Sequence, residues 1–284
     1  MGGVGLDISW FESVIYGLVA GLSEILPVSS AAHENILHSL FGITDGMEYL
    51  RLAVTAGSFV AFLLSMWPLY ARIRRETRIS NSGRRRKKKT KSANMLYVFD
   101  GNLIKTACIP LILGGILYSR IAHWQNMIPV VSLLLVMNGV VLHLPGYFAK
   151  GNKDSRTLSR FDGVILGLCS ALGYFPGVSR VGAGLSACAL RGADGQQALK
   201  WAMLLSAPAL AMKFLVDGYG ILAGDTGTPE AMFLLKCFLA FGFACVGTSI
   251  GIRGMKKILD RTTFESFAFY CWGAALFSFI LYLY

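Results

Sequence analysis

The sequence predicts an all-α polytopic membrane protein with about six transmembrane helices and two re-entrant, broken-helix hairpins in an inverted repeat. Of its 284 residues, 54% are hydrophobic and only 15% are charged, which is typical of a chain embedded in lipid. Two apolar segments are interrupted by proline, glycine and polar residues, and the basic residues are concentrated in a few loops. These three observations together favour a single integral membrane domain over residues 1–284.

The first interrupted segment covers residues 8–44, and its centre reads GLVAGLSEILPVSSAAH at 17–33. An ordinary transmembrane span avoids a carboxylate, a proline and two adjacent serines, so we predict a broken helix. If its second half begins near Pro27, Pro27 fits the first turn and Ser29 or Ser30 can cap it. Ser30 and His33 then share one face of that helix.

The second interrupted segment, residues 161–190, has the same design. It contains GVILGLCSALGYFPGVSRVG at 163–182, and its G-x-x-x-G-L opening repeats that of residues 17–22. Paired, interrupted apolar segments in matching halves indicate a polar site at membrane depth. The first repeat is therefore expected at about 8–147 and the second at about 161–284.

The remaining chain supplies six further apolar runs, which we predict to be membrane spans. The expected spans are residues 52–71, 106–119, 121–149, 201–216, 231–252 and 264–284. Lys213 and Lys236 lie near the ends of their spans, where we expect their ammonium groups to reach the interface.

The basic residues predict the topology. Of the 27 Lys and Arg residues, 22 lie in segments 72–105, 150–160, 191–200 and 253–261. If both hairpins re-enter, all four segments share one side, which the positive-inside rule makes cytoplasmic, and both termini lie outside. If both hairpins crossed fully, two of the segments would change sides. The net charge of +11 therefore indicates a loop beside anionic lipid, with RRRKKKTK at 84–91, rather than a nucleic-acid partner.

Two groups of polar residues are candidates for chemistry. Glu24, Ser30 and His33 form the first, because an ionisable residue within an apolar segment is costly and usually functional. Arg180 in PGVSR is the second. Its guanidinium suits a phosphate group, because we expect it beside Ser179, the loop N–H groups near Gly177 and Gly182, and a helix N-terminus. The alternatives are a helix-end charge for Glu24, a cap for Ser30 and a snorkelling Arg180.

Other reactive side chains lack the spacing that is typical of metal ligands. The six cysteines lie in or beside apolar segments without a CxxC pattern, so we expect buried, small hydrophobic residues. His38 is expected at an interface or in helix packing. Glu34 is expected to be a solvated acid near the outer edge of the first segment, with a ligand of a divalent ion as the alternative.

These motifs resemble those of the undecaprenyl-diphosphate phosphatases, also called bacitracin-resistance proteins. The similarity runs through residues 17–33, PGVSRVG at 176–182, WAMLLSAPAL at 201–210 and a Gly-Ile-Arg…Phe-x-x-Tyr pattern at 251–270. The resemblance implies a multi-pass enzyme of the bacterial inner membrane with its site open to the extracytoplasmic side. It would release phosphate from undecaprenyl diphosphate, a polyprenyl diphosphate lipid, with a divalent cation, Mg²⁺ or Ca²⁺. A homodimer is possible.

The resemblance also implies roles for individual residues. Arg180 would hold the diphosphate, Ser30 would be the nucleophile and His33 the acid/base, although a water activated by His33 is the alternative. Glu24 would orient His33 or bind the metal. The substrate-binding residues would be Ser29, Gly177, Ser179, Arg180, Gly182 and Arg51.

The chain departs from the family pattern at two acidic positions. Ala20 stands where the family has the first of two carboxylates, and Arg51 and Thr55 stand where it has an acidic residue and a polar partner. Two other functions remain open on this basis. One is a polyprenyl-phosphate transporter or flippase, which also uses inverted repeats and broken helices. The other is a catalytically weakened protein that binds lipid phosphates.

Overall fold

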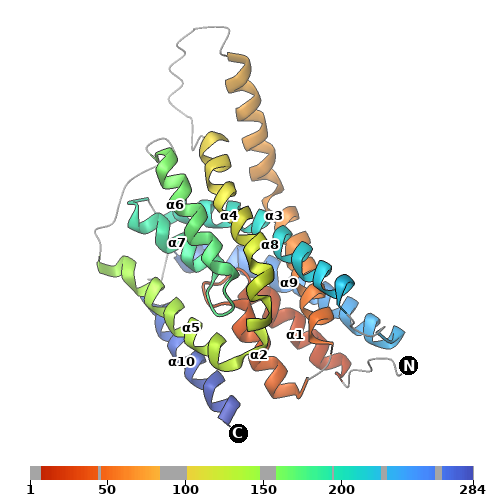
Figure 1. Ribbon diagram of the computed structural model, residues 1–284. Coiled ribbons are helices and arrows are strands. Elements are labelled where there is room, and N and C mark those ends of the chain that lie inside the picture. Colours follow the sequence, from red (N-terminus) through yellow and green to blue (C-terminus); the bar gives the residue numbers. More distant parts are fainter. Residues whose placement is uncertain are drawn as a thin grey trace.

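The computed structural model describes residues 8–43, 46–83, 101–147, 158–193, 195–224, 229–259 and 264–283, whose regular elements are helices (Figure 1). Three short 3₁₀ helices join them at Ala122–Asn126, Leu144–Tyr147 and Leu172–Tyr174. The α-helices are α1 (Trp10–Ser23), α2 (Ser30–Phe41), α3 (Met47–Gly83), α4 (Gly101–Ile121), α5 (Ile128–His143), α6 (Arg160–Ala171), α7 (Arg180–Leu190), α8 (Gly195–Ala223), α9 (Ala231–Leu259) and α10 (Phe264–Leu283).

The six expected spans are confirmed. Six helical stretches are long and apolar enough to cross a membrane, at Met47–Arg72, Leu103–Asn126, Ile128–Tyr147, Ala198–Ala223, Ala231–Met255 and Ser266–Leu283. Large apolar side chains such as Leu64 and Phe238 point outward, 72% and 70% exposed, as lipid-facing residues do. The protein is therefore a multi-pass membrane protein. The basic run at 84–91 lies outside the described residues.

The four other helices, α1, α2, α6 and α7, have only 11 to 14 residues each. At about 1.5 Å per residue, none of them crosses a hydrocarbon core about 30 Å thick. They pair as two hairpins, α1 with α2 and α6 with α7. Each half of the chain thus has one short hairpin followed by three long helices.

The two halves interlock through the glycines of the repeated G-x-x-x-G pattern. Helix α1 packs along α9 of the second half, and α6 packs along α4 of the first half. An added Cβ at Gly17 would collide with the carbonyl oxygen of Ala240, and one at Gly167 with that of Ala107. These glycines therefore permit the close backbone approach that seats each hairpin on the opposite half.

The break in the first hairpin differs from the expectation. Helix α2 begins at Ser30, so Pro27 lies in the preceding turn rather than in the first helical turn. Ser29 occupies the N-cap with a φ of 65° and makes no side-chain capping bond. In the second hairpin, Ser179 does cap α7, because its Oγ accepts the backbone N–H of Gly182 at 3.1 Å. The break at Ser29 holds a non-glycine residue in a left-handed conformation, a form of strain often found at functional sites.

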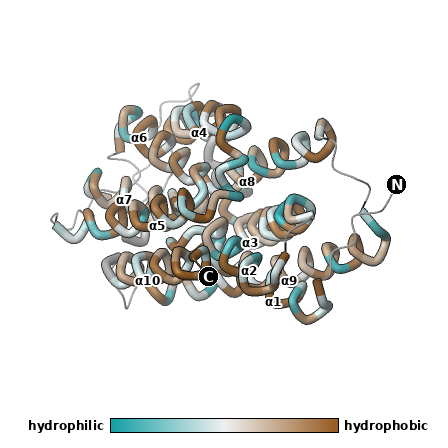
Figure 2. Tube along the Cα trace, turned by 60° about the horizontal axis from the view of Figure 1, so that its bottom comes forward, coloured by the Kyte–Doolittle hydropathy of each residue, from teal (hydrophilic) through white to brown (hydrophobic). Residues whose placement is uncertain are grey.

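The two ends of the bundle differ in charge. We call the end with the exposed Arg74, Arg75 and Lys105 the basic end; α3 extends toward it at the top of Figure 1. The Ala122–Asn126 turn follows α4 at the opposite end, and α10 also ends there, at the bottom of Figure 1. Seen from the opposite end, hydrophobic residues predominate along α1, α5 and α10 (Figure 2).

Candidate active site

The breaks of the two hairpins meet inside the bundle. The Ser179 hydroxyl donates to the Leu26 carbonyl at 3.2 Å. Asn138 of α5, which is fully buried, links both breaks: its Nδ2 donates to the Pro27 carbonyl at 3.1 Å and its Oδ1 accepts the Ser179 N–H at 2.8 Å. Residues more than 100 positions apart are therefore held together by buried polar contacts, which are costly to leave unmade.

Glu24 and Arg180 form an ion pair across this junction. Arg180 Nη1 lies 2.7 Å from Glu24 Oε1, and the two side chains are 5% and 7% exposed. Ser30, the first residue of α2, lies near the same carboxylate. Arg180 Nε is buried and has no hydrogen-bond partner within the described residues. The junction thus brings together a hydroxyl, a carboxylate and a guanidinium whose Nε–H is unpaired.

The loop before α7 is a tight turn, and two of its N–H groups already bond within the protein: that of Ser179 donates to Asn138 Oδ1 and that of Gly182 to Ser179 Oγ. Gly177 has a φ of 109°, which L-residues with a side chain rarely adopt. A Cβ there would also lie 2.5 Å from the Val131 carbonyl oxygen. Ser179 and Gly182 form the cap of α7, so the helix begins directly at Arg180. The predicted phosphate-binding residues of PGVSRVG therefore surround one helix N-terminus.

His33 points away from this junction. Its Nδ1 lies 2.8 Å from the Ser29 carbonyl and its Nε2 lies 2.7 Å from the Tyr270 hydroxyl. A carbonyl oxygen only accepts, so Nδ1 carries the proton and Nε2 accepts from Tyr270. The expectation that Glu24 orients His33 is therefore not met, because Ser29 and α10 hold the ring instead.

His33 and Tyr270 line an apolar cavity of about 450 Å³. The cavity lies between the first hairpin and α10, with Leu22, Leu26 and Phe267 in its wall. Such a cavity beside the polar junction suits an apolar chain attached to a polar head group.

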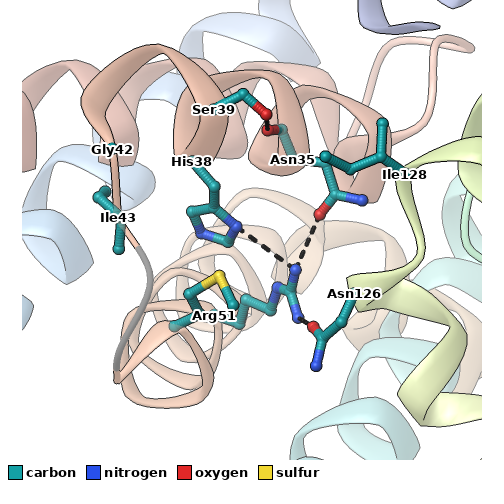
Figure 3. Close-up of a pocket in the computed structure, with 9 residues that line it drawn as sticks. Asn35, His38, Ser39, Gly42, Ile43, Arg51, Asn126 and Ile128 are labelled. Carbon is teal, nitrogen blue, oxygen red and sulfur yellow. Dashed lines mark hydrogen bonds between the residues drawn. The ribbon is translucent and has the colours of Figure 1, made fainter. Parts of the chain in front are cut away.

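A second cavity, of about 350 Å³, opens beside Arg51 of α3 (Figure 3). Arg51 donates to the side chains of Asn35, at 2.8 Å, and Asn126, at 2.5 Å. Its Nη2 also lies 3.4 Å from Nδ1 of His38. His38 is buried and bonds through Nε2 to the Tyr16 hydroxyl at 2.9 Å, which agrees with its expected packing role.

Glu34 is not the solvated acid that we expected. It is 2% exposed and lies 3.5 Å from Arg51 Nε. Helix α2 directs Glu34 toward Arg51 of α3, and the Arg51 guanidinium compensates the buried negative charge. Arg51 Nε and Glu34 Oε2 make no hydrogen bond within the described residues.

Lys213 is also placed differently from the expectation. Helix α8 continues seven residues beyond Val216, to Ala223, so Lys213 lies inside the span and cannot snorkel. It is 7% exposed and donates to Thr55 Oγ1 at 3.0 Å. Its Nζ lies 3.3 Å from Asp217, whose other oxygen accepts from Tyr118 at 2.9 Å.

The carboxylates of the site do not fit a divalent cation. Glu24, Glu34 and Asp217 each lie beside a basic side chain, those of Arg180, Arg51 and Lys213. No group of three or more His, Cys, Asp or Glu residues that could hold a metal occurs within the described ranges. Hard cations require several oxygen ligands, usually with more than one carboxylate. A metal on Glu24 therefore stays a prediction from the resemblance.

Several residues of the site were not recognised as site residues from the sequence. Asn138, Lys213 and Asp217 all lie within apolar spans, where a polar or ionisable residue is itself a functional signal. Applying that rule to every span, and not only to the two interrupted segments, would have found them. Their partners, by contrast, depend on the packing of α3, α5 and α8.

Comparisons with known proteins agree with this architecture. A family model described as bacitracin resistance protein BacA matches residues 13–277. The undecaprenyl-diphosphatase of Desulforudis audaxviator is 32% identical over 267 residues, covering 92% of this chain and 93% of the relative. That of Thermodesulfovibrio yellowstonii is 29% identical over 280 residues, covering 96% and 98%. The chain therefore belongs to the BacA family of bacitracin-resistance proteins.

Proposed function

We propose that the protein hydrolyses undecaprenyl diphosphate to undecaprenyl phosphate and inorganic phosphate. The single observation that supports this best is the junction of the two hairpins, where Arg180 offers a free Nε beside Ser30 and Glu24. The names of the relatives point to the same substrate. The product would return to cell-wall synthesis as a lipid carrier, and removal of the diphosphate form would give bacitracin resistance.

In the proposed mechanism the Nη1 group of Arg180 keeps its ion pair with Glu24, while the Nε–H group donates a hydrogen bond to the terminal phosphate. Ser30 Oγ attacks the terminal phosphorus while its proton passes to Glu24. The bridging P–O bond breaks, and undecaprenyl phosphate leaves with the bridging oxygen. Water then cleaves the phosphoserine and releases inorganic phosphate. Direct attack by water at the same clamp is the alternative, and in either case Arg180 stabilises the charge on the transferred group.

The apolar cavity at His33 would receive the first part of the lipid tail. Its wall is formed by side chains such as Leu22, Leu26 and Phe267. His33 Nε2, which accepts a hydrogen bond from Tyr270, would then lie at the boundary between tail and head group. This is where an acid/base group can exchange a proton with the lipid phosphate.

We further place the protein in the inner membrane, with the cavity at Arg51 open to the extracytoplasmic side. The cavity lies toward the opposite end, next to Asn126, and the basic end would face the cytoplasm. A single cysteine at position 88 should then be labelled only from the cytoplasm, and one at Leu222 only from outside. Leu222 lies in the last turn of α8, at the end of its span. Labelling of both positions from one side would contradict this topology.

Phosphate release from purified protein tests the function. With undecaprenyl diphosphate in detergent, we expect one inorganic phosphate and one undecaprenyl phosphate for each substrate consumed. A transporter would instead move polyprenyl phosphate across a vesicle membrane and release no phosphate. A lipid-phosphate-binding protein would bind the substrate without either change. Either of these results would overturn the proposal.

A further inference from the structure

Three acid–base pairs make up the charged part of the site. Their acids are Glu24, Glu34 and Asp217, and their bases are Arg180, Arg51 and Lys213. The pairs draw on both halves of the chain, and the pair of Glu24 and Arg180 joins the two halves directly. The acids and bases are equal in number, so the carboxylates require no additional cation for charge balance.

Lys213 stands out among the bases, because it is the one ammonium and its pair is connected to another pair. Its Nζ contacts Asp217, which accepts from Tyr118; the Tyr118 hydroxyl accepts from Gln125, whose backbone carbonyl accepts from Arg51. Its buried side chain is anchored on α3 through Thr55. An ammonium is a compact point charge with three donors, whereas a guanidinium is a broad planar group. Lys213 is therefore the base that most resembles a bound metal ion in charge density.

A cation between two carboxylates and a phosphate has a definite task. It lowers the repulsion between the anions and stabilises the charge that develops on the phosphoryl oxygens. A fixed ammonium performs the same electrostatic task without leaving the site, provided that it is held in place beforehand. The hydrogen bond to Thr55 and the ion pair with Asp217 provide this positioning.

We propose that the fixed basic side chains of these pairs, with Lys213 as the ammonium among them, supply the positive charge that a divalent cation would otherwise supply to the carboxylates of the site, so that this chain works without a metal. The inference rests on the proposed function for its activity, and it departs from the metal dependence that the family resemblance implies.

The first test uses the wild-type protein. After treatment with a chelator, phosphate release from undecaprenyl diphosphate should stay within about twofold of its value in millimolar Mg²⁺ or Ca²⁺. A loss of about tenfold or more on chelation, restored by either ion, would overturn the inference while leaving the hydrolase function intact.

The second test measures metal binding itself, with Mn²⁺ as an electron paramagnetic resonance probe. Wild-type protein should bind no stoichiometric Mn²⁺, whereas Lys213→Met leaves an uncompensated carboxylate and should gain a Mn²⁺ site. This readout does not depend on turnover, so it decides the inference even if the wild type released no phosphate and the proposed function failed. Stoichiometric Mn²⁺ on the wild type that Glu24→Gln removes would overturn it.

Variants of Lys213 complete the test. Lys213→Met should lower phosphate release by about tenfold or more, with partial recovery in millimolar Mg²⁺, because a mobile cation then replaces the fixed one. Lys213→Arg should stay insensitive to metal. Lys236→Met is the matched control, because Lys236 belongs to another span, α9, and has no contact with these pairs in the described structure; it should behave like the wild type. A metal-insensitive, fully active Lys213→Met protein would show that Lys213 has no such role.

Discussion

Replacing Arg180 with lysine is expected to lower phosphate release by about a hundredfold or more. The ammonium of lysine is a point charge and cannot hold Glu24 on one nitrogen while donating to phosphate from another. In the structure, Nη1 is occupied by Glu24 and Nε is the free donor. The measurement is the rate of phosphate release from undecaprenyl diphosphate by the purified variant.

Arg191→Lys is the matched control for this prediction. Arg191 follows α7 and pairs with Asp162 at the start of α6, so it belongs to the same hairpin but not to the junction. Its replacement should change turnover by less than about threefold, as for a partly exposed ion pair. A folded Arg180→Lys protein with near-normal turnover would show that PGVSR is not the phosphate clamp.

Ser30→Ala should have an even larger effect, on the order of a thousandfold or more, if the hydroxyl is the nucleophile. The substitution removes the attacking oxygen but leaves the ion pair of Glu24 with Arg180 in place. Ser13→Ala is the control: Ser13 is equally part of the first hairpin, and its hydroxyl donates to the Ser9 carbonyl, away from the junction. Turnover by Ser30→Ala within about tenfold of the wild type would assign the attack to water.

The sequence was sufficient to predict the architecture, because each of its signals is local. Apolar length predicted six spans, and proline and glycine within apolar segments predicted two hairpins. The same repeat predicted a polar site at the two breaks, but not the ion pair between Glu24 and Arg180. Membrane insertion makes these signals strong, since every unpaired polar group in lipid is costly.

Side-chain direction was not predictable in the same way. Ser30 and His33 are three residues apart on α2, yet Ser30 lies near Glu24 whereas His33 bonds to the Ser29 carbonyl and the Tyr270 hydroxyl. Lys213 was misplaced because its apolar run ends near Val216 although the helix continues. In both cases the decisive partners come from other helices, whose packing no local pattern specifies.

The most direct test of the central claim, that both hairpins build one site, is a double-mutant cycle on phosphate release. Glu24→Gln alters the first hairpin and Arg180→Lys the second. If the two residues act in one site, the double variant should be no slower than about the slower single variant, because each change already breaks the same unit. Rate losses that simply multiply in the double variant would show that the two residues act independently, and would contradict the account.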